Sequence, residues 1–471
     1  MSQCILVLGQ VIEIDVLPDD VLLEIFDFYV DTMNSTYSHK WSIEEWQSLV
    51  HVCRRWRALA FESPRRLNLQ LYCTPKTPAR DTLDVWPALP LIVWGNMTSL
   101  SSTDNVIATL GQSNRVSYVH LLDLAGWQLE EIMAAMQVPF PELTGVQLSS
   151  NGETAPVIPD SFIDGSAPRL RKFRLEGIPF TGLPRLLSSA IHLVALELID
   201  IPHSGYISPE GIVTLFAVLP SLERLVLLFQ SHQSRPDWGI RRPPPSKRSV
   251  IPALTYLSFK GVVEYLEDLV TGIDAPQLYL MYISFFNQID FDTPQLAQFI
   301  NRTPKLRTRD EAYVLFKDTL PNVMLQPRPL DITISCREPD WQLSSIVQVC
   351  NSLHPISTVE VLSVENRYWK LDWKNDAIEN TLWLQLLLPF TAVKDLYLSK
   401  EFSLGVAAAL EELVGRRITE VLPSLQNIFV KELKPSGPFQ EKIGQFIAAR
   451  QLSDHPIAIS VWDKNSKVKP I

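Results

Sequence analysis

A short frame of apolar residues recurs along the chain, and this repeat restricts the possible folds more than any other feature of the sequence. The frame reads proline or a polar residue, any residue, leucine, two variable residues, and then two apolar residues separated by one position. Its clearest copies are PELTGVQL (141–148), PRLRKFRL (168–175), PSLERLVL (220–227), PALTYLSF (252–259), PQLYLMYI (276–283) and PSLQNIFV (423–430). Looser copies are NRVSYVHL (114–121), HLVALEL (192–198), TVEVLSV (358–364) and TAVKDLYL (391–398).

The spacing of the frame indicates a repeat protein in which each copy supplies one strand and one return segment. Successive copies are 27, 27, 23, 29, 32 and 24 residues apart. These spacings are counted between the first apolar positions, which are Val116, Leu143, Leu170, Leu193, Leu222, Leu254 and Leu278. The segments 208–220 and 293–304 have helical patterns that end in proline, as expected of return segments, whereas 183–190 predicts only a short helix.

These repeats resemble leucine-rich repeats. The resemblance implies an α/β solenoid with a mainly parallel, curved sheet, which we expect over residues 67–471. The asparagine or cysteine that such repeats carry three residues after the last frame leucine occurs only as Asn151. We therefore expect an irregular, degenerate solenoid.

Two parts of this region depart from the frame. Residues 284–357 interrupt it, and within them 312–316 and 329–336 predict neighbouring strands that belong either to degenerate repeats or to a hairpin. A helix is expected from Trp341 to Leu353. Residues 436–471 predict a C-terminal cap made of a helix and a closing strand.

The outward positions of the predicted strands are the candidate target-binding face. Frame leucines point inward, so the alternating positions point outward. Such a face commonly binds a partner in solenoids, although plain solvation of a sheet surface explains its charged residues equally well. The candidate target-binding residues are Lys172, Arg174, Glu176, Arg224, Tyr256, Lys260, Tyr282 and Tyr397, accompanied by Glu197, Asp395 and Lys431.

The stretch from Leu17 to Arg66 predicts a helical module ahead of the repeats. Pro18 suits a first helical turn, and the acidic pair that follows it favours the positive end of a helix dipole. Ser42 and Glu45 have the spacing of a capping box at the start of a second helical part. Both parts carry apolar stripes, which either dock as an ordinary helical hairpin or leave apolar surface for another protein.

This stretch resembles an F-box. The resemblance rests on LPDDVLLEIF (17–26) followed by LVHVCRRWR (49–57), which match a leucine-proline start, an isoleucine-phenylalanine pair and a valine-cysteine-arginine-x-tryptophan second half. The spacer from Asp31 to Trp41 is longer than in a compact F-box. The whole chain also resembles a group of fungal F-box-like proteins with leucine-rich-repeat-type C-terminal regions, so we expect an F-box-like module over residues 1–66.

The resemblance implies that the chain is a substrate-receptor subunit of a ubiquitin ligase. The module would bind a Skp-type adaptor and through it a cullin, and the solenoid would bind a target protein. The alternative is a leucine-rich-repeat scaffold or binding protein that acts outside a ligase. The residues that the resemblance assigns to adaptor binding are Leu17, Pro18, Val21, Leu22, Ile25, Phe26, Leu49, Val52, Cys53 and Trp56.

Composition agrees with a folded protein inside the cell. The net charge of −10 argues against nucleic acid as the main partner, because phosphate binding needs a basic surface. Five scattered cysteines favour a reducing compartment. No stretch reaches the roughly 20 apolar residues that cross a membrane, and none has the layout of a signal peptide. We expect a cytoplasmic or nuclear protein.

The sequence holds no recognisable catalytic motif. There is no phosphate-binding G-x-x-x-x-G-K-[ST] loop, no G-x-S-x-G nucleophile motif, no C-x-x-C and no H-E-x-x-H. We therefore expect no enzyme activity, no cofactor and no metal. The single basic low-complexity run, RRPPPSKRS (241–249), predicts a solvated loop, with nuclear import, proline-motif binding or phosphorylation as alternatives.

Overall fold

The computed structural model divides the chain into two compact units, Met1–Lys172 and Phe173–Ile471, which are described separately. The residues that it describes are 4–7, 10–13, 17–34, 45–63, 66–67, 69–86, 88–98, 100–152, 155–236, 248–286, 291–307, 309–317, 319–327, 329–336, 339–366, 379–413, 415–432, 437–463 and 466–470. Ser42 of the predicted capping box, most of the spacer 31–41 and most of the basic run 241–249 lie outside these residues. The predicted module boundary near residue 66 stays a prediction.

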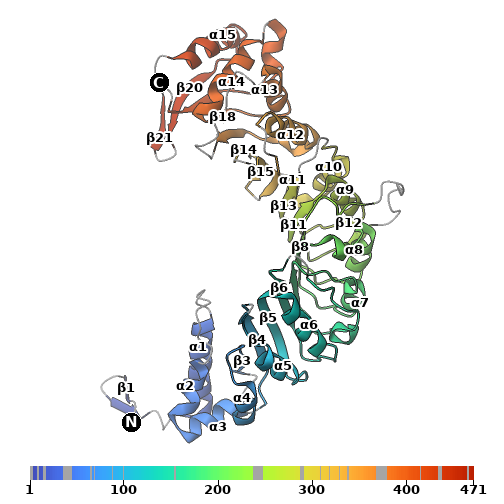
Figure 1. Ribbon diagram of the computed structural model, residues 1–471. Coiled ribbons are helices and arrows are strands. Elements are labelled where there is room, and N and C mark those ends of the chain that lie inside the picture. Colours follow the sequence, from blue (N-terminus) through green and yellow to red (C-terminus); the bar gives the residue numbers. More distant parts are fainter. Residues whose placement is uncertain are drawn as a thin grey trace. The chain divides into compact units, whose positions relative to one another are not determined.

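The first unit begins with helices and continues into a parallel sheet (Figure 1). A short antiparallel pair, β1 (Cys4–Val7) and β2 (Gln10–Glu13), precedes α1 (Asp19–Asn34), α2 (Glu45–Val52) and α3 (Arg54–Glu62). The sheet order is β3 (Leu71–Cys73), β4 (Leu91–Asn96), β5 (Val116–Leu124) and β6 (Gly145–Ser150), and all of its pairs are parallel. The connecting helices are α4 (Ala79–Val85), α5 (Asp104–Leu110) and α6 (Gly126–Ala135).

The second unit continues the strand-and-return pattern in its N-terminal half. The strand β7 (Lys172–Glu176) straddles the border, and β8 (Ala195–Ile201), β9 (Arg224–Phe229), β11 (Tyr256–Gly261) and β13 (Leu280–Phe285) pair in parallel order. A short parallel pair, β10 (Ser249–Val250) and β12 (Ile273–Asp274), lies apart from this sheet. The return helices are α7 (Leu183–Leu187), α8 (Pro209–Phe216), α9 (Val263–Thr271), α10 (Pro294–Arg302) and α11 (Pro304–Arg307).

An antiparallel insertion reverses the strand order in the middle of the second unit. The strands are β14 (Glu311–Phe316), β15 (Asn322–Gln326) and β16 (Leu330–Ile334), and β15 pairs antiparallel with both neighbours. The strand β16 joins β13 in parallel, so the spatial order is β13, β16, β15, β14. Residues 312–316 and 329–336 form strands as predicted, but they are not neighbours, because the unpredicted strand β15 lies between them.

The C-terminal part returns to parallel pairing. The strands β17 (Val361–Asn366), β18 (Asp395–Leu398), β19 (Asn427–Lys431) and β20 (Ala458–Asp463) follow β14 in parallel, and β21 (Ser466–Pro470) closes the sheet antiparallel. The helices are α12 (Pro339–Ser352), α13 (Asn380–Leu387), α14 (Lys400–Glu411) and α15 (Pro438–Leu452). Short 3₁₀ helices span Phe162–Gly165, His203–Gly205, His354–Thr358 and Gly415–Thr419.

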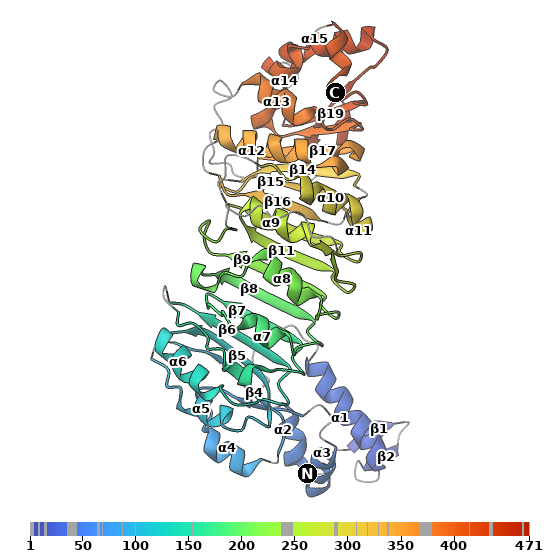
Figure 2. The ribbon, with the colours of Figure 1, turned by 90° about the vertical axis from the view of Figure 1, so that its right-hand side faces the viewer.

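The frame residues form the core of both units. Val116, Leu143, Leu170, Leu193, Leu222, Leu254 and Leu278 are each 0% exposed. In the second unit, helices α8, α9, α10 and α12 lie along one face of the sheet, and no described helix of that unit covers the other face (Figure 1 and Figure 2). The result is a mixed helix-and-strand protein with a large, mostly parallel sheet, as the spacing of the frame predicts.

The neighbouring return helices α9 and α10 are joined by a half-buried carboxylate. Glu267 of α9 accepts hydrogen bonds from the backbone N–H groups of Gln295 and Leu296, each at 2.8 Å, in the first turn of α10. These donors have no partner within their own helix, so the carboxylate caps it. Burial, with smaller contributions from the charges of Asp292 and Asp268, raises the pKa of Glu267 to about 7 against the lowering effect of these hydrogen bonds.

We expect the effect of Glu267→Gln on the stability of the second unit to depend on pH. Relative to wild type, the variant should be more stable at pH 8 than it is at pH 5. The folded carboxyl binds its proton more tightly than the unfolded chain, whose pKa is 4.5. Its contribution to stability is therefore full below about pH 4.5 and is lost as the pH rises through about 7. Thermal unfolding from pH 5 to pH 8 measures the difference between variant and wild type. The exposed Glu223→Gln is the control, and a Glu267→Gln difference that does not change with pH would contradict the assignment.

Candidate functional site

The helical module of the first unit has a small aromatic and aliphatic core. Leu22 and Phe26 of α1 are completely buried, and Leu49 of α2 and Trp56 of α3 are nearly so. The rings of Phe26 and Trp56 are tilted against each other with 4.7 Å between their centroids. These four predicted adaptor-binding residues therefore hold the helices together and are not available at the surface.

Cys53 divides the second helical part into two helices. The apolar spacing from Leu49 to Trp56 is helical in sequence, but the backbone of Cys53 is extended, with φ −155° and ψ 172°. Its Sγ accepts a hydrogen bond from the backbone N–H of Trp56 at 3.4 Å, so the thiol caps the start of α3. Arg57 donates from Nε to the Val50 carbonyl at 2.9 Å, near the end of α2. The cysteine is a structural cap that turns the chain.

Two arginines tie α1 to the later part of the module. Arg55 donates to Asp19 Oδ1 from Nε at 3.0 Å and from Nη2 at 2.5 Å, and to the Leu17 carbonyl at 2.6 Å. Arg66, which follows α3, forms an ion pair with Glu24 of α1. These contacts fix the start of α1, where Leu17 is half-buried and Pro18 is exposed.

A second apolar stripe of α1 faces away from the module core. Val21 is 41% exposed, Ile25 38% and Phe28 76%, at spacings of four and three residues along one side of the helix. Val52, at the end of α2, is 56% exposed. Of the predicted adaptor-binding residues, Pro18, Val21, Ile25 and Val52 thus remain at the surface. Sequence reasoning missed Phe28, although the paired apolar residues 21–22 and 25–26 signalled two stripes rather than one.

The N-terminal part of the second unit's sheet carries a ladder of paired charges on its outward face. Arg174 contacts Glu176 at 2.8 Å and Glu197 at 2.9 Å, and Glu197 also accepts from Arg224 Nε at 2.6 Å. The guanidinium of Arg224 lies 3.7 Å from the centroid of the Tyr256 ring. Arg174, Glu176, Glu197 and Arg224 are all partly exposed, and their charges neutralise one another.

The ladder continues into an aromatic pair. Tyr256 and Tyr282 lie side by side with 5.5 Å between ring centroids, and Lys260 lies 3.7 Å from Asp200. Lys172, at the end of the first unit, is exposed. The predicted face residues of β9, β11 and β13 thus form one connected surface.

The C-terminal part of the same sheet carries a different set of side chains. Tyr397 stacks on Phe429 with 4.4 Å between ring centroids and meets Trp462 edge-on at 5.4 Å. Tyr313 donates from its hydroxyl to Glu311 Oε2 at 2.9 Å. Sequence reasoning named Tyr397 and missed Tyr313, because β14 lies in the section where the frame is lost.

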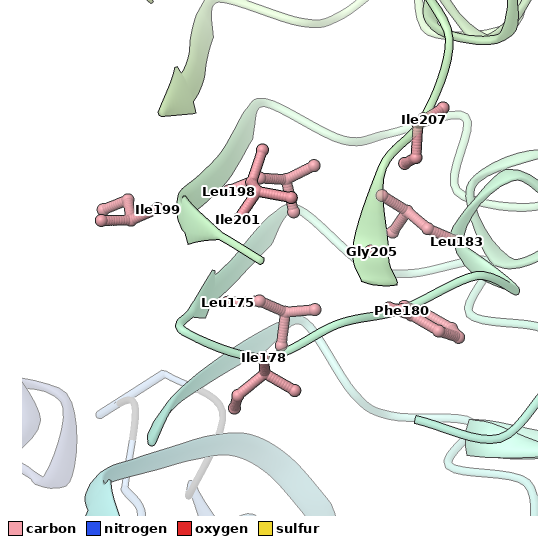
Figure 3. Close-up of a pocket in the computed structure, with 9 residues that line it drawn as sticks. All are labelled: Leu175, Ile178, Phe180, Leu183, Leu198, Ile199, Ile201, Gly205 and Ile207. Carbon is pink, nitrogen blue, oxygen red and sulfur yellow. The ribbon is translucent and has the colours of Figure 1, made fainter. Parts of the chain in front are cut away.

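The described residues offer no site for metal or small-molecule chemistry. No group of three or more histidine, cysteine, aspartate or glutamate side chains is placed to hold a metal ion among them. A pocket between β7, α7 and β8 is lined by apolar residues and Gly205 (Figure 3), so it is a gap in the core packing. None of the described helices is both long and apolar enough to span a membrane.

Comparison with known families identifies the first helices. Residues 14–69 match the family model described as F-box-like. An F-box-like domain therefore occupies α1 to α3, which confirms that part of the predicted resemblance. No curated protein matches the chain.

Solved structures that are distantly similar to the chain include the following two. One is the leucine-rich repeat-containing protein LegL7 of Legionella pneumophila, with 12% identity, 80% of this chain and 97% of that chain covered, and a TM-score of 0.27. The other is the Rad7 and Elc1 complex of yeast, with 13% identity, 88% of each chain covered, and a TM-score of 0.25.

We expect Phe26→Ala to destabilise the F-box-like domain by about 3–5 kcal/mol, because it leaves a cavity against Trp56. Phe28→Ala removes the same atoms from an exposed position of the same helix and should change stability by less than about 0.5 kcal/mol. Native-state hydrogen exchange of amides in α1 and α3 of the intact chain measures both effects. Equal effects of the two substitutions would contradict the assignment of inner and outer stripes.

Proposed function

We propose that this chain is the target-recognition subunit of a Skp–cullin–F-box type ubiquitin ligase. The observation that supports it best is the set of exposed apolar residues on the F-box-like domain, which are Val21 and Ile25 on one side of α1, Val52 at the end of α2, and Pro18 just before α1. Apolar side chains that stay exposed on one side of a domain are typical of a protein interface. In this proposal that surface binds a Skp-type adaptor, which connects the chain to a cullin.

We further propose that the region after the domain is a degenerate leucine-rich-repeat-like solenoid that holds the target protein. The supports are the completely buried frame leucines, the repeated parallel strand pairs and the helices along one sheet face. The uncovered face then binds the target and keeps it near the ubiquitin-loading enzyme. Proximity alone supplies a large rate factor, so the chain needs no catalytic group of its own.

The same proposal places the protein in the cytoplasm or nucleus, where these ligases act, and makes it a non-catalytic subunit without a cofactor. Nucleic acid is a poor partner for a chain with a net charge of −10. A scaffold outside any ligase is the competing function. Binding of the adaptor without recruitment of a cullin would favour that scaffold.

We expect Val52→Asp to weaken binding of the Skp-type adaptor by about 30-fold or more, because truncating or charging an interface anchor typically costs about 2 kcal/mol or more. Val250→Asp is the matched control, since Val250 is 57% exposed in the second unit and Val52 is 56% exposed. Affinity is measured with purified intact chain and adaptor by isothermal titration calorimetry. Equal affinity of the two variants, or no adaptor binding by the wild-type chain, would contradict the proposal.

A further inference from the structure

One row of outward side chains crosses the second unit's sheet from β13 to β19. The strand register places these residues directly opposite one another on neighbouring strands. We name them the aromatic–acidic row, whose members in spatial order are Tyr282, Asp331, Met324, Tyr313, Ser363, Tyr397 and Phe429. Glu311 and Asp395 flank the row, two residues before Tyr313 and Tyr397 on the same strands, and therefore on the same face.

The charges along this row differ from those of the ladder on β7 to β9. In the ladder, every charge is paired: Arg174, Glu197 and Arg224 each have an oppositely charged side chain within 3 Å. Among the described residues, by contrast, no ion pair involves Glu311, Asp331 or Asp395. Glu311 is held by the Tyr313 hydroxyl, and Asp395 accepts from Asn427 Nδ2 at 2.7 Å.

Basic side chains are scarce on these strands. Across β13 to β20, the sequence contributes a single lysine, Lys431 at the end of β19, and no arginine. Glu311, Asp331 and Asp395 outnumber it on the described face. The row therefore has a net negative charge around the partly exposed rings of Tyr282, Tyr313 and Tyr397, whereas its members Ser363 and Phe429 are buried.

The raised pKa values of two tyrosines in the row are consistent with this negative charge. Burial, with the hydrogen bond to Glu311 and the charges of Glu311 and Glu365, raises the pKa of Tyr313 to about 12. Burial also raises the pKa of Tyr397, with added contributions from Asp395 and Glu311. Carboxylates that disfavour a phenolate at these positions favour a cation there, because the interaction has the opposite sign.

The chain itself shows how a cation is held on this face. Arg224 lies with its guanidinium 3.7 Å from the Tyr256 ring centroid and its Nε 2.6 Å from Glu197. Tyr313 with Glu311 and Tyr397 with Asp395 likewise place a tyrosine beside a carboxylate, and Phe429 covers one face of the Tyr397 ring. Among the described residues, no cationic group lies over the ring of Tyr313 or Tyr397.

We propose that the aromatic–acidic row binds an extended, arginine- or lysine-rich segment of the partner protein. This inference rests on the proposed function, since it names the chemistry of the target that the sheet face would hold. The row spans seven strands, so its six gaps of about 4.8 Å make roughly 29 Å. An extended segment of about nine residues covers that length. Its alternating basic side chains would lie over the tyrosine rings beside Glu311 and Asp395.

The test uses the intact chain and a labelled peptide of about nine residues that alternates arginine and serine, matching the estimated length of the row. Fluorescence anisotropy at low and physiological salt measures its affinity against that of the same peptide with glutamate in place of arginine. The variant Glu311→Gln with Asp395→Asn removes two charges from the row. The matched control, Glu176→Gln with Asp200→Asn, removes two charges from the paired ladder on the same face.

We expect the arginine peptide alone to bind, and the row variant to weaken it about fivefold while the ladder variant leaves affinity within about twofold. Equal weakening by both variants would mean that binding depends only on the net charge of the chain, and it would overturn the inference. So would equal binding of both peptides, or binding of neither. Adaptor affinity of the same samples separates the two proposals: failure of peptide binding with adaptor binding intact overturns the row alone, and the reverse result overturns the ligase proposal alone.

Discussion

The parallel, in-register pairing of strands is the constraint on which the rest of this structure depends. Where neighbouring strands carry successive copies of the frame, as in β9, β11 and β13, a leucine in one copy packs beside the leucine of its neighbour and both are excluded from water. Because side chains alternate across a strand, the same register that aligns the leucines inside also aligns one row of side chains outside. The charged ladder and the aromatic–acidic row are thus consequences of how the core is packed.

The F-box-like domain solves a different problem, since its helices are short and bury little surface alone. The contact of Phe26 with Trp56 and the capping thiol of Cys53 fold three helices around a small core. This arrangement buries one apolar stripe of α1 in the core and leaves the stripe of Val21 and Ile25 exposed. The domain is therefore held together by residues that differ from those offered to a partner, although both sets lie in the same motif.

Much of the fold was predictable from the sequence, because the frame and its spacing depend on local periodicity. The antiparallel insertion is not predictable in this way, because the strand patterns of residues 312–316 and 329–336 do not determine which strands pair or in which direction. The site was less predictable. Phe26 and Ile25 are adjacent in sequence and opposite in burial, which only the packing of Trp56 decides. Tyr313 comes into one row with Ser363 and Tyr397 only through the pairing of β14 with β17 and of β17 with β18.

In the proposed function, the helical domain binds an adaptor and the sheet face binds a target, each independently of the other. Hydrogen–deuterium exchange of the intact chain, with and without a Skp-type adaptor, tests it most directly. The account predicts slower exchange in peptides that cover α1, α2 and α3, and unchanged exchange in peptides that cover β13 to β19. Protection of those strands by the adaptor, or unchanged exchange in α1 to α3, would contradict it.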